Sequence, residues 1–456
     1  MALAASPTYK LTPSSEKGVL ASNYVSNFDY LDQFLPEVDK KEFNRYGRRT
    51  ISGFLSKLSA ELPYASSTVK WSEEGRLHTL YNNVALDAAK TFTPNLPAGA
   101  TSHVFRVNET VIVSKGAVVQ KGIITAITAT TFDAEPYDAA TWDATFLSGS
   151  GLAIYVYGSE FAKGSNGMSG SLEAQTDIFE NKGVIIKDLY EISGSDMAQI
   201  GWIEVTDNSS GEMGYLWYLK SKSDTVERFA DRLEMAVVEG ELAAAGSGAA
   251  TAGFKGTEGF FSTVSTRGNV HDGLIDTLAE FDSIVDRLNK QGAIEENMMY
   301  VSTPQDRAVD DFLATQNSYF SGGASWGAFE NGEKMALDLG FQGFRRNGYS
   351  FYKTPWKYLN DASTRGGVDV AGTVHGVICP AGSKTVYDEV LGQNIKQPFL
   401  SIRYRKSQTE DRKYKTWITG SAGGATNTDL DAMQVQFLSE RMLCTVGANN
   451  FVIAKG

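Results

Sequence analysis

The feature that most constrains this chain is a long amphipathic segment between Gly211 and Ala243. Apolar side chains recur along it with the spacing of one helix face, at Val226, Phe229, Ala230, Leu233 and Val237. Ser209 and Glu212 indicate its start, and a glycine-rich run from Gly246 to Gly259 indicates its end. At 1.5 Å per residue such a helix would be about 50 Å long. The pattern therefore predicts a strut joining parts of the chain, with Phe229, Leu233 and Val237 as packing residues.

Composition places the chain among folded proteins. It has 456 residues, 42% apolar and 21% charged, enough for two or three domain-sized cores. The net charge of −12 disfavours a protein that grips phosphate backbones, but it is compatible with a container for nucleic acid. Two distant cysteines give no disulfide framework, and we expect neither a secretory leader nor a membrane span.

The first 60 residues predict an arm with little core of its own. At its end, apolar residues follow helical spacing up to Pro63, at Ile51, Phe54, Leu55, Leu58 and Leu62. Two interpretations stay open for this segment. It is either a surface helix on the same domain or an arm that docks on a neighbouring subunit, with Phe54 and Leu58 as packing candidates.

Residues 101–157 change to short β-type runs. We expect strands at Val104–Val107, Thr110–Val113, Ala117–Val119, Ile123–Ile127 and Ile154–Tyr157, separated by turns at Asn108-Glu109, Lys115-Gly116 and Lys121-Gly122. Such spacing predicts a small antiparallel barrel or sandwich inserted into the main chain. A connector rich in glycine and serine follows at 158–170, and a second β-rich piece lies within 172–192.

The rest of the chain has a mixed α/β pattern. Thr277 and Glu280 form a capping box, and Gly292 predicts the end of that helix. Thr303-Pro304 predicts the start of another helix, and Asn347-Gly348 predicts a hairpin turn. Further strands are expected at Met298–Val301, Val374–Ile378, Leu400–Tyr404, Tyr414–Ile418, Met433–Phe437 and Phe451–Ile453.

Residue patterns that carry catalysis or bind metals and cofactors are absent from the sequence. The four histidines are dispersed, no phosphate-binding loop occurs, and Gly167–Gly170 lacks the spacing of a nucleophile elbow. The adjacent acids Glu295-Glu296 and Asp310-Asp311 are expected in solvent. We therefore predict no catalytic residue, cofactor or metal.

Basic residues cluster at Arg345-Arg346 and along 403–415, where they alternate with Tyr404, Tyr414 and Trp417. This loosely resembles a nucleic-acid surface. A charged hairpin face or a subunit contact explains it equally, and the acidic total favours that interpretation.

The order of parts resembles the major capsid protein of tailed bacteriophages, the Hong Kong 97 type. The residues that carry the resemblance are Leu172–Phe179, Leu189–Ser195, the helix with Glu234, Glu239 and Gly240, and Gly348–Pro355. The resemblance implies an α+β fold and a podovirus-like or crAss-like phage. It divides the chain into an N-terminal arm (1–60), an extended loop (61–195), a spine-helix region (196–260), a peripheral domain (255–317 and 431–456) and an axial domain (318–430).

The function implied by this resemblance is a non-enzymatic shell protein. Pentamers and hexamers of the chain would enclose double-stranded DNA without sequence-specific binding, in a virion made in the host cytoplasm. Portal, scaffolding or decoration proteins would be its other partners. No coiled-coil scaffolding segment or Lys–Asn cross-linking pair is identified. The alternatives are an encapsulin-like compartment shell and a β-rich surface or carbohydrate-binding protein, the latter suggested by 20 Tyr and 7 Trp. A hydrolase is the least favoured of the alternative functions.

Overall fold

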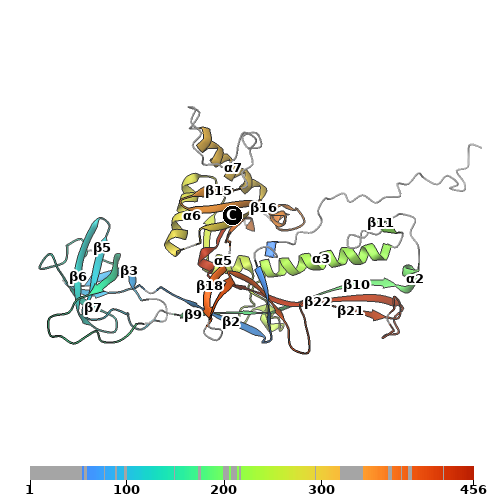
Figure 1. The fold of residues 1–456 in the computed structure, drawn as a ribbon, viewed down its shortest axis with the longest axis horizontal. Coiled ribbons are helices and arrows are strands. Elements are labelled where there is room, and N and C mark those ends of the chain that lie inside the picture. The colour runs from blue at the N-terminus through green and yellow to red at the C-terminus, as the bar shows by residue number, and fades with distance from the viewer. Residues whose placement is uncertain are drawn as a thin grey trace, which may run out of the picture. The chain divides into compact units, whose positions relative to one another are not determined.

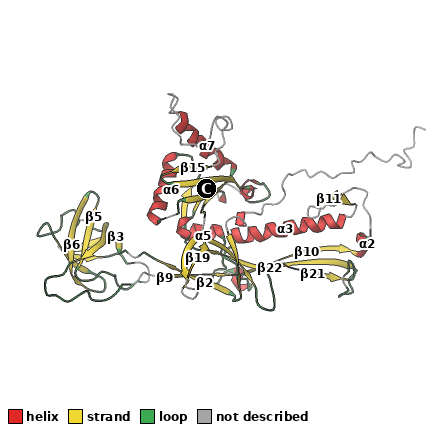
Figure 2. Ribbon diagram, in the orientation of Figure 1, coloured by secondary structure: helices red, strands yellow, loops and turns green. Residues whose placement is uncertain are grey.

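A computed structural model describes most of the chain after residue 53. The described residues are 54–55, 59–76, 78–87, 90–96, 100–147, 149–172, 176–198, 205–206, 213–214, 217–292, 294–318, 343–367, 372–381, 383–388, 393–424 and 426–456. Helices and strands are mixed along the chain, as expected for an α+β protein (Figures 1 and 2). The chain divides into two compact units, of which the first includes 187–231 and 416–437 and the second includes 51–186, 232–415 and 438–456.

The first unit is built around the amino-terminal part of strand β22 (Ala432–Thr445), which has β10 (Val184–Ser193) and β21 (Lys415–Gly420) as neighbours. Met433, Val435 and Phe437 are buried and alternate with half-buried glutamines, as predicted. The unit also contains α2 (Gly194–Met197), β11 (Val205–Thr206) and β12 (Met213–Gly214).

The long helix α3 spans Trp217–Glu239 and is shorter than predicted. Met213 and Gly214 do not belong to it, because they pair as a strand with Val205 and Thr206. The proposed starting residues Ser209 and Glu212 lie outside the described residues. The helix ends before Gly240, where a Cβ atom would lie 2.6 Å from the carbonyl oxygen of Thr257. A close approach of two chain segments therefore ends the helix four residues before Ala243.

The second unit contains a six-stranded sheet with the order β13-β23-β17-β14-β16-β15. Its strands are β13 (Asn269–Asp272), β14 (Glu296–Val301), β15 (Gly343–Arg346), β16 (Tyr349–Pro355), β17 (Val374–Pro380) and β23 (Val452–Lys455). Because β14 pairs in parallel with β16, this sheet contains residues from both sides of the predicted division between peripheral and axial domains at 317/318.

Helices α6 (Leu278–Gln291) and α7 (Thr303–Ser318) pack their apolar residues against this sheet. The predicted capping box of α6 is confirmed, since Thr277 Oγ1 accepts the amide of Glu280 at 3.3 Å and Gly292 ends the helix at φ 69°. Asn347 and Gly348 form the predicted β15–β16 turn with φ of 50° and 87°. These local signals fix both ends of α6 and the turn between β15 and β16.

A second group of strands in this unit joins distant parts of the chain. β1 (Ser59–Tyr64) pairs in parallel with β20 (Leu400–Arg405), which pairs antiparallel with the end of β22. The predicted helix through Leu62 is therefore wrong from Ser59 onward. Pro63 is tolerated because, among the described residues, β1 has a partner strand on one side only. Smaller elements are α4 (Gly248–Thr251), α5 (Phe260–Arg267), α9 (Lys357–Asn360), η2 (Arg365–Gly367), η4 (Ala448–Asn450) and the hairpin β18 (Ser383–Asp388) with β19 (Gln393–Pro398).

The predicted inserted β domain is a closed six-stranded barrel, here called the barrel. Its strands are β3 (Leu80–Asp87), β4 (Thr91–Thr93), β5 (Glu109–Lys115), β6 (Val118–Ile127), β7 (Phe132–Pro136) and β8 (Leu152–Ser159). It therefore starts about twenty residues earlier than expected, because β3 and β4 precede residue 101. Val104–Val107 is not a strand, and Lys121-Gly122 is inside β6 rather than a turn.

The chain enters and leaves the barrel through a two-stranded antiparallel ribbon, here called the ribbon. It pairs β2 (Thr68–Glu74) with β9 (Thr176–Lys182), and among the described residues neither strand pairs with a third strand. The predicted extended loop thus consists of a ribbon that carries a folded barrel.

Candidate assembly surfaces

The predicted packing residues of α3 belong to the interior of the folded chain. Phe229, Leu233 and Val237 are all buried. The ring of Phe229 lies 5.7 Å from that of Phe437, within the first unit. Val226, predicted on the same stripe, is 37% exposed. Phe229, Leu233 and Val237 therefore stabilise the folded chain and are not available as a surface for other molecules.

Residues 54 and 55 are anchored on the carboxyl-terminal half of α3. The amides of Phe54 and Leu55 donate to Glu234 Oε1 at 2.9 and 3.4 Å. The ring of Phe54 stacks on Trp356 at 4.3 Å and meets Tyr300 edge-on at 4.7 Å. These two residues are therefore packed within their own chain, whereas Leu58 and the arm up to residue 50 lie outside the described residues.

The last turn of α3 is held by a second acidic residue, Glu239. Tyr358 Oη donates to Glu239 Oε1 at 2.6 Å, and Arg365 Nη1 donates to Glu239 Oε2 at 2.7 Å. Burial, followed by this hydrogen bond, raises the pKa of Tyr358 above its ordinary range. No motif in the sequence indicated these contacts, because the partners are more than a hundred residues apart.

The root of the ribbon is held by the amide of Asn181, which is 1% exposed. Its Nδ2 donates to the carbonyl oxygens of Glu258 at 2.9 Å and of Leu443 at 2.6 Å. Its Oδ1 accepts the backbone amide of Glu258 at 2.8 Å and the hydroxyl of Thr257 at 3.3 Å. One side chain therefore connects β9, the segment after α3 and β22.

Arg267, at the end of α5, contacts the same part of the ribbon. Its guanidinium carbon lies 4.1 Å from the centre of the Phe179 ring and 5.8 Å from that of Trp71. Its ion pairs with Glu73 and Glu258 are longer, at 3.9 and 3.8 Å. Asn181 and Arg267 together hold the ribbon against α5, the segment after α3 and β22.

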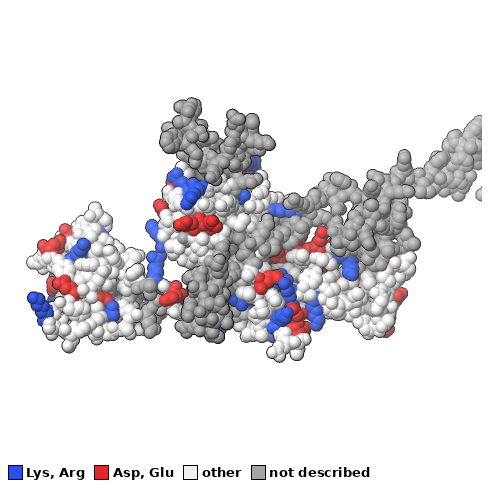
Figure 3. All heavy atoms as spheres, in the orientation of Figure 1, with Lys and Arg blue, Asp and Glu red and all other residues white. Residues whose placement is uncertain are grey.

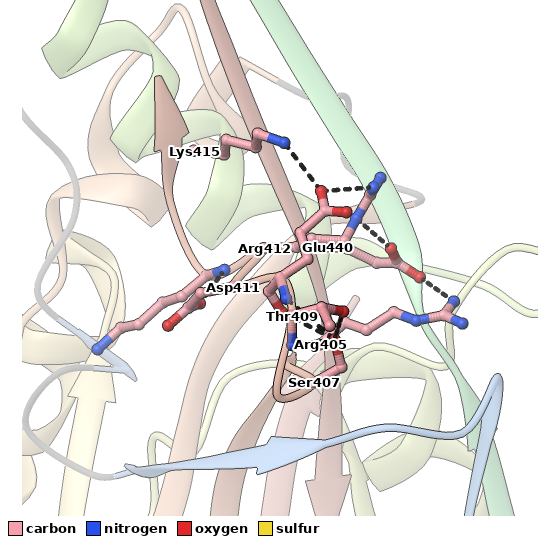
Figure 4. Close-up of polar contacts among 9 residues, drawn as sticks. Arg405, Ser407, Thr409, Asp411, Arg412, Lys415 and Glu440 are labelled. Atoms are coloured by element: carbon pink, nitrogen blue, oxygen red, sulfur yellow. Dashed lines mark hydrogen bonds and ion pairs between the residues drawn. The ribbon is translucent and has the colours of Figure 1, made fainter. Parts of the chain in front are cut away.

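Most side chains of the basic sequence clusters are paired with carboxylates. Glu440, at 7% side-chain exposure, accepts a hydrogen bond from Arg405 Nη1 at 2.8 Å and forms an ion pair with Arg412, whose Nε lies 2.8 Å from Oε2 (Figure 4). Nearby, Glu410 pairs with Lys415 at 2.9 Å and Asp411 pairs with Lys406 at 2.9 Å. Lys413 pairs with Glu61, and Arg346 makes a two-pronged contact with Asp282 at 2.8 and 2.7 Å.

This pairing favours a charged hairpin face over a nucleic-acid surface, because phosphate binding needs cations that protein carboxylates do not already neutralise. Acidic and basic side chains are likewise interspersed on the face seen in Figure 3.

One of the two adjacent acidic pairs that were expected in solvent is only half solvated. Asp310 lies 2.5 Å from the buried Lys353 Nζ, which also pairs with Asp306 at 2.9 Å.

The described residues contain no group of three or more His, Cys, Asp or Glu side chains able to hold a metal ion. His103 is packed in the barrel, where Nδ1 accepts the amide of Phe105 at 3.2 Å. Burial lowers the pKa of His375 and raises that of the Cys379 thiol. No described helix is long and apolar enough to cross a membrane.

Comparison with known proteins gives similarity to solved structures alone. No family model matches the chain, and no curated protein matches its sequence. A chain of Gordonia phage Cozz superposes with a TM-score of 0.41 at 11% identity, covering 97% of this chain and 99% of that one. The capsid of Cyanophage P-SCSP1u gives a TM-score of 0.40 at 8% identity and 93% coverage of both chains.

The holo-SrpI encapsulin complex from Synechococcus elongatus PCC 7942 gives a TM-score of 0.34 at 9% identity, covering 62% of this chain and 77% of that one. At TM-scores below 0.5 the similarity does not by itself establish a family or a function.

Proposed function

We propose that this chain is a major capsid protein of Hong Kong 97 type. Pentamers and hexamers of it assemble into the icosahedral head shell of a tailed bacteriophage around double-stranded DNA. The observation that carries this proposal is a set of three two-stranded sheets, β2–β9, β11–β12 and β18–β19, without a third strand among the described residues. Isolated two-stranded sheets are marginally stable in water, so contacts with further copies would complete their order.

The anchoring of α3 supports a role as the spine of such a subunit. Its carboxyl-terminal half receives residues 54–55 through Glu234 and the segment 358–365 through Glu239. A rigid helix that ties the start of the described chain to a later segment can transmit load between subunit contacts. We assign α3 as the spine, and the ribbon with its barrel as the extended loop.

The charge distribution supports a container for DNA. The chain carries a net charge of −12, and most of its clustered arginines and lysines are paired with carboxylates. Electrostatic adhesion to packaged DNA would therefore be weak. Portal, scaffolding and decoration proteins, a virion location after synthesis in the host cytoplasm, and the podovirus-like or crAss-like subtype are parts of the same proposal.

Particle formation by the purified protein tests the proposal. Sedimentation velocity and negative-stain microscopy should find closed or tubular particles in addition to free subunits. Salt concentration should be varied, and a coexpressed scaffold should be included. Protein that stays monomeric under every condition contradicts a shell function.

Two other functions make different predictions for the same sample. An encapsulin-like shell would assemble without nucleic acid and would enclose a protein cargo, which the absorbance ratio and mass spectrometry of the particles would show. A carbohydrate-binding protein would form no particles and would bind a glycan array. The isolated two-stranded sheets and the pairing of cations with carboxylates favour the phage capsid over the carbohydrate-binding protein.

A further inference from the structure

The outer surface of the barrel carries an apolar face that the barrel itself does not need. Strand registers place Leu80, Tyr155, Ile112 and Lys121 side by side across β3, β8, β5 and β6. Directly paired residues point to the same side of a sheet. Val119 lies one row further on β6, on the same side as Lys121. We call these five residues and Tyr157 the barrel face.

The barrel face is exposed. Val119 is 57%, Leu80 53%, Tyr157 46% and Tyr155 41% exposed, while the neighbouring Ile154 and Val113 point inward and are fully buried. The ammonium group of Lys121 lies 5.7 Å from the centre of the Tyr157 ring, so the basic and aromatic side chains share one surface.

The interior of the barrel is already complete. Its buried core includes Phe92, Phe105, Phe132 and Phe146, with Trp142 closing one end through a hydrogen bond to the carbonyl oxygen of Ala134 at 2.8 Å. A closed barrel also has no free sheet edge that needs covering. Contiguous apolar surface outside a finished core marks a contact with another molecule.

We propose that the barrel face binds a second copy of this chain, an inference that rests on the shell function proposed above. The composition favours a protein partner, because tyrosines with branched aliphatic residues are typical of protein interfaces. The six residues include no carboxylate or amide to bind sugar hydroxyls, and one lysine is too few for a nucleic acid.

Charge favours a copy of this chain as that partner. The face carries one cation and no anion, whereas the chain as a whole has a net charge of −12. An acidic surface on a neighbouring copy would complement Lys121, and the apolar side chains around it would supply the buried area. The barrel would thus be a clamp between subunits.

The test uses the variant Tyr155→Asp in the full chain, with Leu147→Asp as the matched control. Leu147 is equally apolar and 48% exposed, but it lies in the loop before β8 and outside the face. Tyr155→Asp should reduce the assembled fraction about tenfold or more, as the loss of a central interface residue does. Leu147→Asp should assemble like the wild type. Equal assembly of both variants overturns the proposal.

A second measurement on wild-type particles does not depend on the folding of a variant. Particles assembled from a mixture of ¹⁴N- and ¹⁵N-labelled chains are treated with a carbodiimide, which joins Lys121 to a carboxylate in contact. Cross-linked peptides of Lys121 with mixed isotopes show a contact between copies. Cross-links confined to one chain, or to an auxiliary protein, overturn the proposal. Absence of wild-type particles would instead contradict the shell function itself.

Discussion

At the scale of single residues, the burial of Tyr64 makes the free energy of unfolding depend on pH. Its side chain is buried on β1, and its hydroxyl has no hydrogen-bond partner among the described residues. Burial, followed by the carboxylate of Glu440, raises its pKa from 10.0 to about 12. The folded state favours the neutral phenol over the ionised one. The contribution of this preference to the free energy of unfolding is therefore complete below pH 10 and is lost as the pH rises toward 12.

Tyr64→Phe should therefore change the free energy of unfolding little at neutral pH, since the lost hydroxyl had no partner. Near pH 11 the variant should be more stable than the wild type by about 1 kcal/mol. Urea unfolding of the unassembled subunit at both pH values measures this. Tyr352→Phe, at a half-exposed tyrosine, is the control. An unchanged pH dependence in Tyr64→Phe would show that another group causes the alkaline loss.

The residue scale also shows where prediction from the sequence stops. Thr277, Glu280 and Gly292 were predictable because each acts on backbone groups within a few residues. Asn181 and Glu239 were not, because their partners Leu443 and Tyr358 become neighbours only once the chain has folded. The α3 stripe was predicted down to Phe229, Leu233 and Val237, but nothing in it indicated whether another copy or the same chain would cover them.

At the scale of elements, the barrel depends on a glycine inside a strand. A Cβ atom on Gly122 would lie 2.5 Å from the carbonyl oxygen of Glu135 and 2.6 Å from the Trp142 ring. Gly122→Ala should therefore overpack the barrel core and destabilise it by about 1–3 kcal/mol. Hydrogen exchange of β5 and β6 amides measures this locally. Gly167→Ala, where a Cβ would meet no atom within 4 Å, should leave exchange unchanged. Equal protection in both variants would contradict the close packing of Trp142.

Two positions of α3 that differ in burial provide another test. Phe229→Asp places an unpaired charge in a fully buried position and should cost upwards of about 4 kcal/mol, so that no particles form. Val226→Asp, three residues earlier and partly exposed, should assemble normally. Thermal unfolding of the soluble fraction and negative-stain microscopy distinguish the two variants. Normal particles from Phe229→Asp would show that this face of α3 does not pack in the core.

At the scale of the whole molecule, pairing between distant strands limits what sequence patterns can predict. The individual strands β14, β16 and β17 were predicted, but their pairing was not, because the parallel pairing of β14 with β16 joins segments on both sides of residue 318. For the same reason, residues 59–62 were predicted as the end of a helix although they belong to β1, since the partner strand β20 lies in the far half of the chain. Periodicity indicates the type of an element but not its neighbour in space.

If the chain forms the proposed shell, the direction of the ribbon is the property of the whole molecule that should determine how copies meet. Asn181→Ala removes four hydrogen bonds that join the ribbon to residues 257–258 and to Leu443. The subunit should still fold, but its ribbon should point less uniformly. We therefore expect particles of mixed diameter, open sheets or tubes in place of one closed size, as measured by negative-stain microscopy.

Asn297→Ala is the matched control, because Asn297 is also fully buried and donates to a carbonyl oxygen, that of Ile294, at 2.9 Å. It lies on β14 in the six-stranded sheet, away from the ribbon in the strand order. Both variants should lower the thermal midpoint, but only Asn181→Ala should widen the distribution of particle diameters. If both variants give the same particles, the Asn181 amide contributes stability alone, and the geometry of the shell is set elsewhere in the subunit.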